Sequence, residues 1–254
     1  MARSAFAENR PMTTRTPSLA HPPKALAFDI FGTVVDWHSG IAAEAAAMAG
    51  RHGISGDWNA FATAWRDGYY PAMDRVRRGE LPWTLIDDLH RMILDDIADA
   101  HGFGGLNEAD RKHLNHAWHR LMPWPDAVPG LLRLKRTYTI STLSNGNFSL
   151  LTDMAKHAGL PWDCIISAEL FGHYKPDREA YHGCARLLGI EPGELMLVAC
   201  HPSDLRGAKS HGLRTAYVKR PKEEGPHGVL PEIDEGEFDL VADDFAQLAG
   251  VLHA

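Results

Sequence analysis

Four short polar segments, far apart in the 254-residue chain, carry residue types that could do chemistry together. A carboxylate can act as a nucleophile or as a general acid or base, and a nearby lysine can keep it ionised. Hydroxyl and amide groups can bind an anion. A carboxylate, an amide and a lysine rarely meet in one set by chance. The candidate residues are Asp29, Ser144, Asn145, Lys175, His201 and Asp204.

Each of these segments follows a stretch that predicts a strand, or lies in the loop after one. Apolar runs alternate with helical patterns along 123–254, which predicts an α/β fold with a Rossmann-like parallel sheet and helices on both faces. Ligands bind outside the carboxyl ends of the strands in such sheets, so the four segments should meet there. The predicted strands are 24–30, 138–143, 164–167, 195–199, 214–218 and 240–241, and the predicted helices of this core are 127–135, 148–158, 178–188 and 204–211.

Residues 38–122 show helical patterns without a strand between them, so we expect a small all-helical unit inserted into the core. The core would then be discontinuous, made of residues 24–37 and 123–254. Residues 1–23 are rich in Ala, Pro, Ser and Thr and lack a continuous apolar segment, which predicts a disordered tail or an over-long reading frame with Met12 as the start. The predicted helices of the insert are 41–51, 58–74, 85–100 and 109–121.

Composition excludes several classes of partner. The chain has 26 Lys+Arg against 33 Asp+Glu and a formal net charge of −7, which disfavours nucleic acid. No stretch approaches the roughly 20 apolar residues of a membrane helix, so no membrane partner is expected. The three cysteines have spacings that match no zinc motif and favour a reduced, cytoplasmic chain. Residues 220–236 are rich in proline, glycine and charge and predict a surface loop.

The order and spacing of the polar segments resemble a known family. The run from Asp29 to Val34, the Ser-Asn-Gly segment 144–146, the pair Lys175-Pro176 and the segment around Asp204 are similar to the four motifs of the haloacid dehalogenase (HAD) superfamily. The match runs from residue 24 to about 246 and includes the helical insert, which corresponds to the family's cap. Within the superfamily the chain resembles the L-2-haloacid dehalogenases, including relatives that act on haloacetates. The resemblance implies a HAD-like core with a cap and hydrolytic removal of halide.

The residue two positions after Asp29 distinguishes a haloacid dehalogenase from a phosphatase of the same superfamily. Superfamily phosphatases carry a second Asp there, which protonates the leaving group and helps to hold Mg²⁺, whereas this chain has Phe31. Halide leaves without a proton, and few oxygen ligands surround Asp204, so we expect no metal and no cofactor. The alternatives are a phosphatase of the same superfamily, a hydrolase that opens a small strained ring, and a non-catalytic binding protein.

The resemblance implies a catalytic role for five residues. Asp29 would be the nucleophile: it would attack the carbon that bears the halogen and form an aspartyl ester, which water then hydrolyses. Lys175 would keep Asp29 ionised. Asp204, alone or with His201, would activate the water, and Thr33 would hydrogen-bond near Asp29. His201 is also a departure, because the haloacid enzymes commonly carry Asn at that position.

The expected substrate is a small anionic halogenated acid. Ser144 and the backbone N–H groups of Ile30 and Phe31 would hold its carboxylate. Arg66 and Asn145 would donate to the halide as its charge develops. The alternative for Arg66 is a helical arginine on the surface.

Two further residues follow from the same comparison. Trp37 would form an apolar wall with Phe31, and Tyr181 stands six residues after Lys175, similar to the family's Lys and Tyr pair. Core packing is the alternative for both. Similar proteins are often dimers, so a homodimer is a candidate oligomeric state. The sequence leaves open the preferred halogen, the chain length and the stereochemistry.

Overall fold

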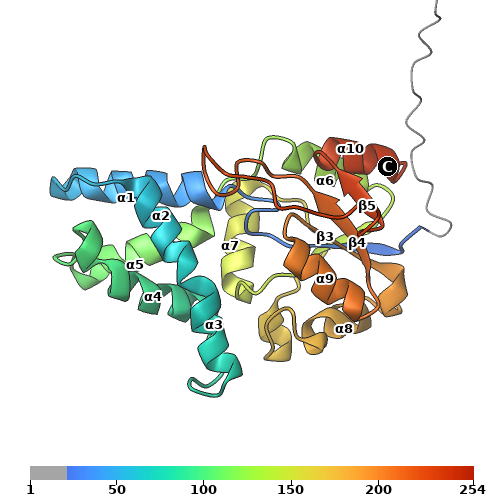
Figure 1. Cartoon of the computed structure of the whole chain (residues 1–254), viewed down its shortest axis with the longest axis horizontal. Coiled ribbons are helices and arrows are strands. Elements are labelled where there is room, and N and C mark those ends of the chain that lie inside the picture. The colour runs from blue at the N-terminus through green and yellow to red at the C-terminus, as the bar shows by residue number, and fades with distance from the viewer. Residues whose placement is uncertain (1–21) are drawn as a thin grey trace, which may run out of the picture.

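The computed structural model describes residues 22–254, and its centre is a parallel sheet of five strands (Figure 1). The strand order is β2-β1-β3-β4-β5, so β1 lies between β2 and β3. All residues of β1 and β3 are buried, as expected for strands covered on both faces. The strands are β1 Ala25–Phe28, β2 Thr139–Thr142, β3 Leu195–Ala199, β4 Arg214–Val218 and β5 Leu240–Ala242.

Five helices cover the two faces of the sheet, and the side chains of β1 alternate between them. Leu26 and Phe28 pack in one apolar cluster with α6, α7 and α10, while Ala25 and Ala27 pack in a second cluster with α8 and α9. Successive side chains of β1 thus point to opposite faces, and helices cover both faces, as the sequence predicts. The helices are α6 Ala127–Leu134, α7 Phe148–Ala158, α8 Arg178–Leu187, α9 Pro202–Ser210 and α10 Phe245–Val251.

The segment between β1 and α6 is helical and forms a separate block beside the sheet (Figure 1). The predicted helix 58–74 is wrong as a single element: it is two helices that meet at Gly68, where an added Cβ would lie 2.5 Å from Ile93. Asp36 accepts the Ser39 N–H, so the first helix begins at Trp37. The helices are α1 Trp37–His52, α2 Trp58–Asp67, α3 Tyr69–Arg77, α4 Ile86–Ile97 and α5 Glu108–Asn115, with short 3₁₀ turns at Asp99–His101 and His116–Arg120.

The predicted strand 164–167 is also wrong. This segment makes only isolated bridges to the sheet, because side chains take the backbone groups that a strand would pair. Thr142 Oγ1 donates to the Ile166 carbonyl and accepts its N–H, both at 2.8 Å, and Asp163 accepts the N–H of Ile140 at 2.9 Å. The segment still runs beside β2 and leads on toward Lys175.

The segment 220–236 is not entirely the surface loop that its composition predicts. Arg220 and Glu223 are buried. Arg220 forms a two-point ion pair with Asp126, at 2.8 and 3.0 Å, and donates to the Thr33 carbonyl. The loop is thereby tied to the turn that follows β1. The predicted tail lies almost wholly outside the described residues, and none of the helices within 22–254 is long and apolar enough to cross a membrane.

Candidate active site

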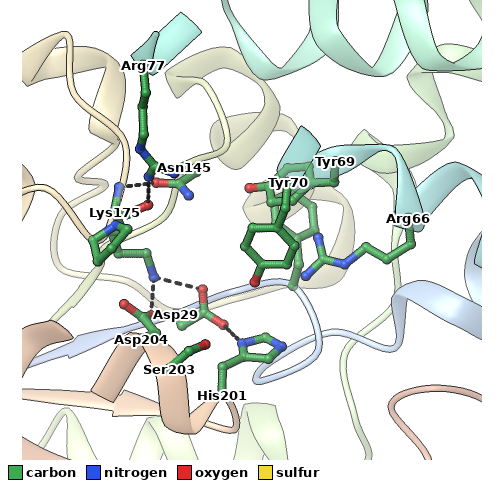
Figure 2. Close-up of a pocket in the computed structure, with 12 residues that line it drawn as sticks. Asp29, Arg66, Tyr69, Tyr70, Arg77, Asn145, Lys175, His201, Ser203 and Asp204 are labelled. Atoms are coloured by element: carbon green, nitrogen blue, oxygen red, sulfur yellow. Dashed lines mark hydrogen bonds and ion pairs between the residues drawn. The ribbon is translucent and has the colours of Figure 1, made fainter. Parts of the chain in front are cut away.

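Asp29 directly follows β1 and is the centre of a buried hydrogen-bond network (Figure 2). Its Oδ1 accepts from Lys175 Nζ at 2.9 Å, and its Oδ2 accepts from Thr33 Oγ1 at 2.8 Å and from His201 Nδ1 at 3.0 Å. Burial alone would raise the pKa of Asp29, but Lys175 and His201 outweigh it and hold the pKa far below its ordinary value. Asp29 is therefore ionised.

Lys175 bridges two carboxylates. Its Nζ lies 2.9 Å from Asp29 and 2.5 Å from Asp204 Oδ2, and its backbone N–H donates to Asn145 Oδ1 at 2.7 Å. Burial opposes its charge, yet the two carboxylates raise the pKa of Lys175. Tyr181 donates to Asp204 Oδ1 at 2.6 Å, so both oxygens of Asp204 accept a bond. Lys175 is thus fixed as a cation between the carboxylates of Asp29 and Asp204.

His201 lies between Asp29 and a third carboxylate, Glu223. Its Nε2 is 2.7 Å from Glu223 Oε1. Ionised carboxylates only accept hydrogen bonds, so both ring nitrogens carry protons and His201 is an imidazolium. Burial opposes this state, but the carboxylates of Glu223 and Asp29 hold the pKa of His201 well above its ordinary value.

A metal ion does not suit this cluster. The ligand atoms of Cys200, His201 and Glu223 lie within 4.8 Å of one another in the described chain. Burial raises the pKa of the Cys200 thiol to about 11, so it is protonated and donates to Glu223 Oε2 at 3.2 Å. Both nitrogens of His201 face carboxylates. The donor atoms are thus engaged with one another.

Arg66 reaches the site from α2 in the helical block (Figure 2). Its guanidinium packs over the ring of Tyr69 at 4.5 Å and lies 5.5 Å from the ring of Trp37 and 5.9 Å from that of Tyr70. Within residues 22–254 its Nη1 is buried and has no hydrogen-bond partner. Burial opposes the charge, but Tyr70, Tyr69 and the carboxylates nearby hold the pKa of Arg66 above its ordinary value. A buried cation thus carries an unused donor.

These groups enclose a cavity of about 130 Å³ between the sheet and the helical block. Its wall includes seven of the residues that the sequence analysis names: Asp29, Phe31, Arg66, Asn145, Lys175, His201 and Asp204. The others on the wall are Tyr69, Tyr70, Arg77, Pro176 and Ser203. Arg66, Arg77 and the rings of Tyr69 and Tyr70 come from the helical block, whereas both carboxylates come from the α/β core. The arrangement suits attack by Asp29 on a small bound anion.

Comparison with known proteins now places the chain. The sequence-family model that describes haloacid dehalogenase-like hydrolases matches residues 23–212. The chain belongs to this hydrolase family. One similar solved structure is a defluorinating L-2-haloacid dehalogenase, which is 45% identical with a TM-score of 0.86; the match covers 91% of this chain and 96% of that one. Another is an L-2-haloacid dehalogenase that is 43% identical with a TM-score of 0.84; the match covers 91% of this chain and 99% of that one. A curated relative, the (S)-2-haloacid dehalogenase 4A of Burkholderia cepacia, is 30% identical over 78% of this chain and 83% of its own.

Five of the named residues of this haloacid dehalogenase-like hydrolase do not line the cavity. Thr33 and Tyr181 act on residues that do, through their bonds to Asp29 and Asp204. Trp37 is fully buried beneath Arg66, and its Nε1 donates to Glu223 at 3.2 Å. Ser144 is fully buried and accepts the N–H of Gly146 at 3.1 Å, so its contact with a substrate stays a prediction. The fifth residue is Ile30.

The backbone at Ile30 is nevertheless placed for binding. Within the described chain, the N–H groups of Ile30 and Phe31 donate to no acceptor. They directly follow Asp29 and lie at the end of β1. Unpaired N–H groups beside a cavity can receive an anion.

The hydrolase also contains functional candidates that the sequence analysis missed. Arg77 lies seven residues after Tyr70 on α3, hence on the same helix face, and this spacing could have revealed it. Its guanidinium donates to the Lys175 carbonyl and lies 3.5 Å from Asp177, joining the helical block to the core. Glu223 stands in an irregular loop, and nothing in its sequence context distinguishes it from Glu224.

Proposed function

We propose that this hydrolase cleaves the carbon–halogen bond of small 2-haloalkanoic acids, of the haloacetate or 2-halopropionate type. The products are the 2-hydroxy acid and halide, and the reaction passes through an ester on Asp29. The solved relatives at 45% and 43% identity, both titled L-2-haloacid dehalogenases, support this reaction class.

The observation that carries the proposal is the unpaired cation Arg66 across the cavity from Asp29 (Figure 2). Lys175 and His201 are already balanced by carboxylates, and Arg77 is paired with Asp177. Arg66 makes no salt bridge within the described chain. A buried charge without a partner is costly, so its presence here is best explained by an anionic ligand. A haloacid supplies such a charge as its carboxylate and again as the departing halide.

The first step uses the ionised carboxylate of Asp29. One of its oxygens attacks the carbon that bears the halogen, and the halide leaves with the bonding electrons. Arg66 and the Nδ2 group of Asn145, whose only partner in the described chain is the sulfur of Met73 at 3.5 Å, donate to the departing halide. The N–H groups of Ile30 and Phe31 hold the substrate carboxylate.

The second step hydrolyses the ester. Asp204 lies on the cavity wall and accepts bonds from Lys175 and Tyr181, which fix its orientation. It takes a proton from the attacking water. A phosphatase would need a proton donor for its leaving alkoxide two residues after Asp29, and there the apolar ring of Phe31 lines the cavity. Phe31 therefore favours a halide leaving group.

Halide release tests the proposal. We expect the enzyme to release halide from at least one of fluoroacetate, chloroacetate and the two enantiomers of 2-chloropropionate, at the same rate with EDTA present. Replacing Asp29 by Asn should abolish turnover, with deamidation excluded by mass spectrometry. Hydrolysis of p-nitrophenyl phosphate that requires Mg²⁺, without halide release from any haloacid, would refute it.

The location and assembly belong to the same proposal. All three cysteines are free, which supports a reducing, cytoplasmic compartment. A homodimer is proposed from the family resemblance alone. Size-exclusion chromatography with light scattering tests it directly, and a monomeric mass would refute it.

A further inference from the structure

The two oxygens of Asp29 lie in different surroundings. Oδ1 accepts one bond, from Lys175. Oδ2 accepts two, from Thr33 Oγ1 and His201 Nδ1. The Thr33 hydroxyl donates to Oδ2, because an ionised carboxylate can only accept, and the hydroxyl oxygen itself accepts the N–H of Cys200 at 2.9 Å. Oδ1 is therefore the less restrained oxygen and the better nucleophile, while two fixed donors point at Oδ2.

Glu223 occupies a site built around its carboxylate. Its Oε1 accepts from His201 Nε2 at 2.7 Å and from Trp37 Nε1 at 3.2 Å, and its Oε2 accepts from Cys200 Sγ at 3.2 Å. The carboxylate packs against Gly32, where an added Cβ would lie 2.1 Å from Oε1. Only glycine leaves room for Glu223 at this position. Glu223 is 8% exposed and does not line the cavity around Asp29, so substrate does not reach it there.

We propose that Oδ1 of Asp29 bonds to the substrate, that Thr33 and His201 bind the negative charge that develops on Oδ2 during ester hydrolysis, and that Glu223 is the positioning residue that keeps His201 cationic for this task. This inference rests on the proposed function, because it concerns the second step of that reaction. It assigns the two residues different roles: His201 stabilises the negative charge on Oδ2, and Asp204 accepts the proton of the attacking water.

The electron and proton balance of the step follows from this assignment. In the first step a lone pair of Oδ1 forms the bond to carbon as the carbon–halogen pair leaves with halide. Water then attacks Cγ, the π electrons of the Cγ–Oδ2 bond move onto Oδ2, and Asp204 takes a proton from the water. On collapse the Cγ–Oδ2 double bond reforms and the Cγ–Oδ1 bond breaks. Oδ1 leaves as the product hydroxyl and receives the proton from Asp204. The regenerated carboxyl of Asp29 now contains the oxygen of the water, and it releases the second proton of the water to solvent, which restores the carboxylate.

The need for Glu223 arises when the ester forms. Alkylation removes the charge of Asp29, which is one of the two carboxylates that hold His201 protonated. The other groups that face His201 are Cys200, the phenol of Tyr217 on β4, and the neighbouring loop carboxylate Glu224. Cys200 and Tyr217 are neutral at pH 7, since burial raises their pKa values to about 11 and about 12.

Glu224 does not replace Glu223 in this role, because it is exposed and makes no hydrogen bond to the imidazole in the described chain. Arg66 also lies near Glu223 and lowers the pKa of that carboxyl together with His201, although burial opposes this. Among residues 22–254, Glu223 therefore remains the one anion that is hydrogen-bonded to His201 at the ester stage.

Single-turnover kinetics with excess enzyme tests the assignment, with chloroacetate as the probe. Quenched samples report halide for the first step and glycolate for the second, and intact mass reports the ester. The variant is Glu223→Gln, which keeps the shape and removes the charge. Glu224→Gln is the matched control from the same loop. With competent enzyme in saturating excess over chloroacetate, the first-order rate constants of the two steps do not depend on the amount of misfolded enzyme, so partial misfolding does not affect the result.

We expect Glu223→Gln to form the ester at a rate within about threefold of the wild-type rate, but to hydrolyse it at least ~10-fold more slowly. As pH rises and His201 loses its proton, this slowing should approach roughly 10²–10³-fold, the usual effect of removing one oxyanion donor. The ester should accumulate, and hydrolysis should fail at a lower pH than in the wild type. Glu223→Asp, which keeps the charge, should recover part of the rate, and Glu224→Gln should match the wild type.

Three results would overturn the inference. One is equal slowing of both steps in Glu223→Gln, which indicates a structural role. Another is an unchanged pH profile of ester hydrolysis. The third, which needs no variant, is a wild-type hydrolysis rate that stays constant while pH rises through the titration of His201. Absence of halide release from the wild type would instead refute the proposed function.

Discussion

Replacing Arg66 by Met separates function from stability at one residue. Methionine has similar length and an unbranched, adaptable side chain, so it can lie on the rings of Tyr69 and Trp37 where the guanidinium now packs. The change removes a buried cation whose Nη1 has no partner in the described chain. Catalysis and folding should respond in opposite ways.

The activity should fall by roughly 10²–10³-fold in kcat/KM, the usual effect of removing one preorganised donor at a site of developing charge. Fluoride concentrates its charge more than bromide does, so the loss should be larger with fluoroacetate than with bromoacetate. Halide release at matched enzyme concentration measures both. The control is Arg75→Met on the neighbouring helix α3, an exposed residue outside the cavity, which should leave the rate unchanged.

The free energy of unfolding should stay within about 1 kcal/mol or rise. Cation–π contacts with the three neighbouring rings, each about 0.5–1 kcal/mol and up to about 2 when desolvated, are lost. The desolvation penalty of a buried ion, several kcal/mol, is removed at the same time. Urea denaturation measures the difference. A loss above about 3 kcal/mol, or an unchanged rate on every haloacid, would show that Arg66 serves the fold and refute the reasoning.

Two further changes test other parts of the site, and a third tests the stability of the fold. Lys175→Met should move the acid limb of the pH profile of kcat/KM to higher pH. Burial raises the pKa of Asp29 once Lys175 no longer lowers it, and the ionised carboxylate is lost as pH falls through that pKa. An acid limb at the wild-type pH would contradict this prediction. His119, whose pKa Asp87 and Asp153 raise against the effect of burial, stabilises the fold fully below pH ~6.5 and progressively less as pH rises through its folded pKa. His119→Gln should therefore cost about 1.5–3 kcal/mol near pH 6 and less at pH 9, measured by urea denaturation. Gly32→Ala forces a Cβ against Glu223 at φ +84° and should slow ester hydrolysis as well as destabilise by roughly 1–2 kcal/mol, whereas Gly53→Ala, at φ +66° with open space, should only destabilise.

The sequence predicts those parts of the site that depend on strand ends. Asp29, Asn145 and His201 each come directly after a strand or its extension, and parallel strands bring their carboxyl ends together. The β1 and β3 runs are continuous and apolar, so their assignment needs no tertiary information. The same kind of apolar run misleads at 164–167, because the hydroxyl of Thr142 bonds Ile166 where a ladder would otherwise form.

Glu223 could not be predicted because tertiary contacts alone fix its loop. Arg220 pairs with Asp126 and bonds the Thr33 carbonyl, which turns the loop inward, and Gly32 leaves the space that Glu223 fills. None of these contacts leaves a helical or strand-like spacing of residues in the sequence. Arg77, by contrast, lies on α3 seven residues after Tyr70, so once Tyr70 is known to line the cavity, helical spacing is enough to predict that Arg77 shares that face.

Charge balance within the site explains why an acidic chain can process an acidic substrate. Three cations, Arg66, Lys175 and His201, face three carboxylates, Asp29, Asp204 and Glu223, so the free site is neutral despite the net charge of −7. Substrate adds one negative charge. Once Asp29 is alkylated and halide has left, the ester stage is neutral again, with all three cations in place. The negative charge that forms during hydrolysis therefore develops in a site that does not repel it, beside a donor that Glu223 keeps charged.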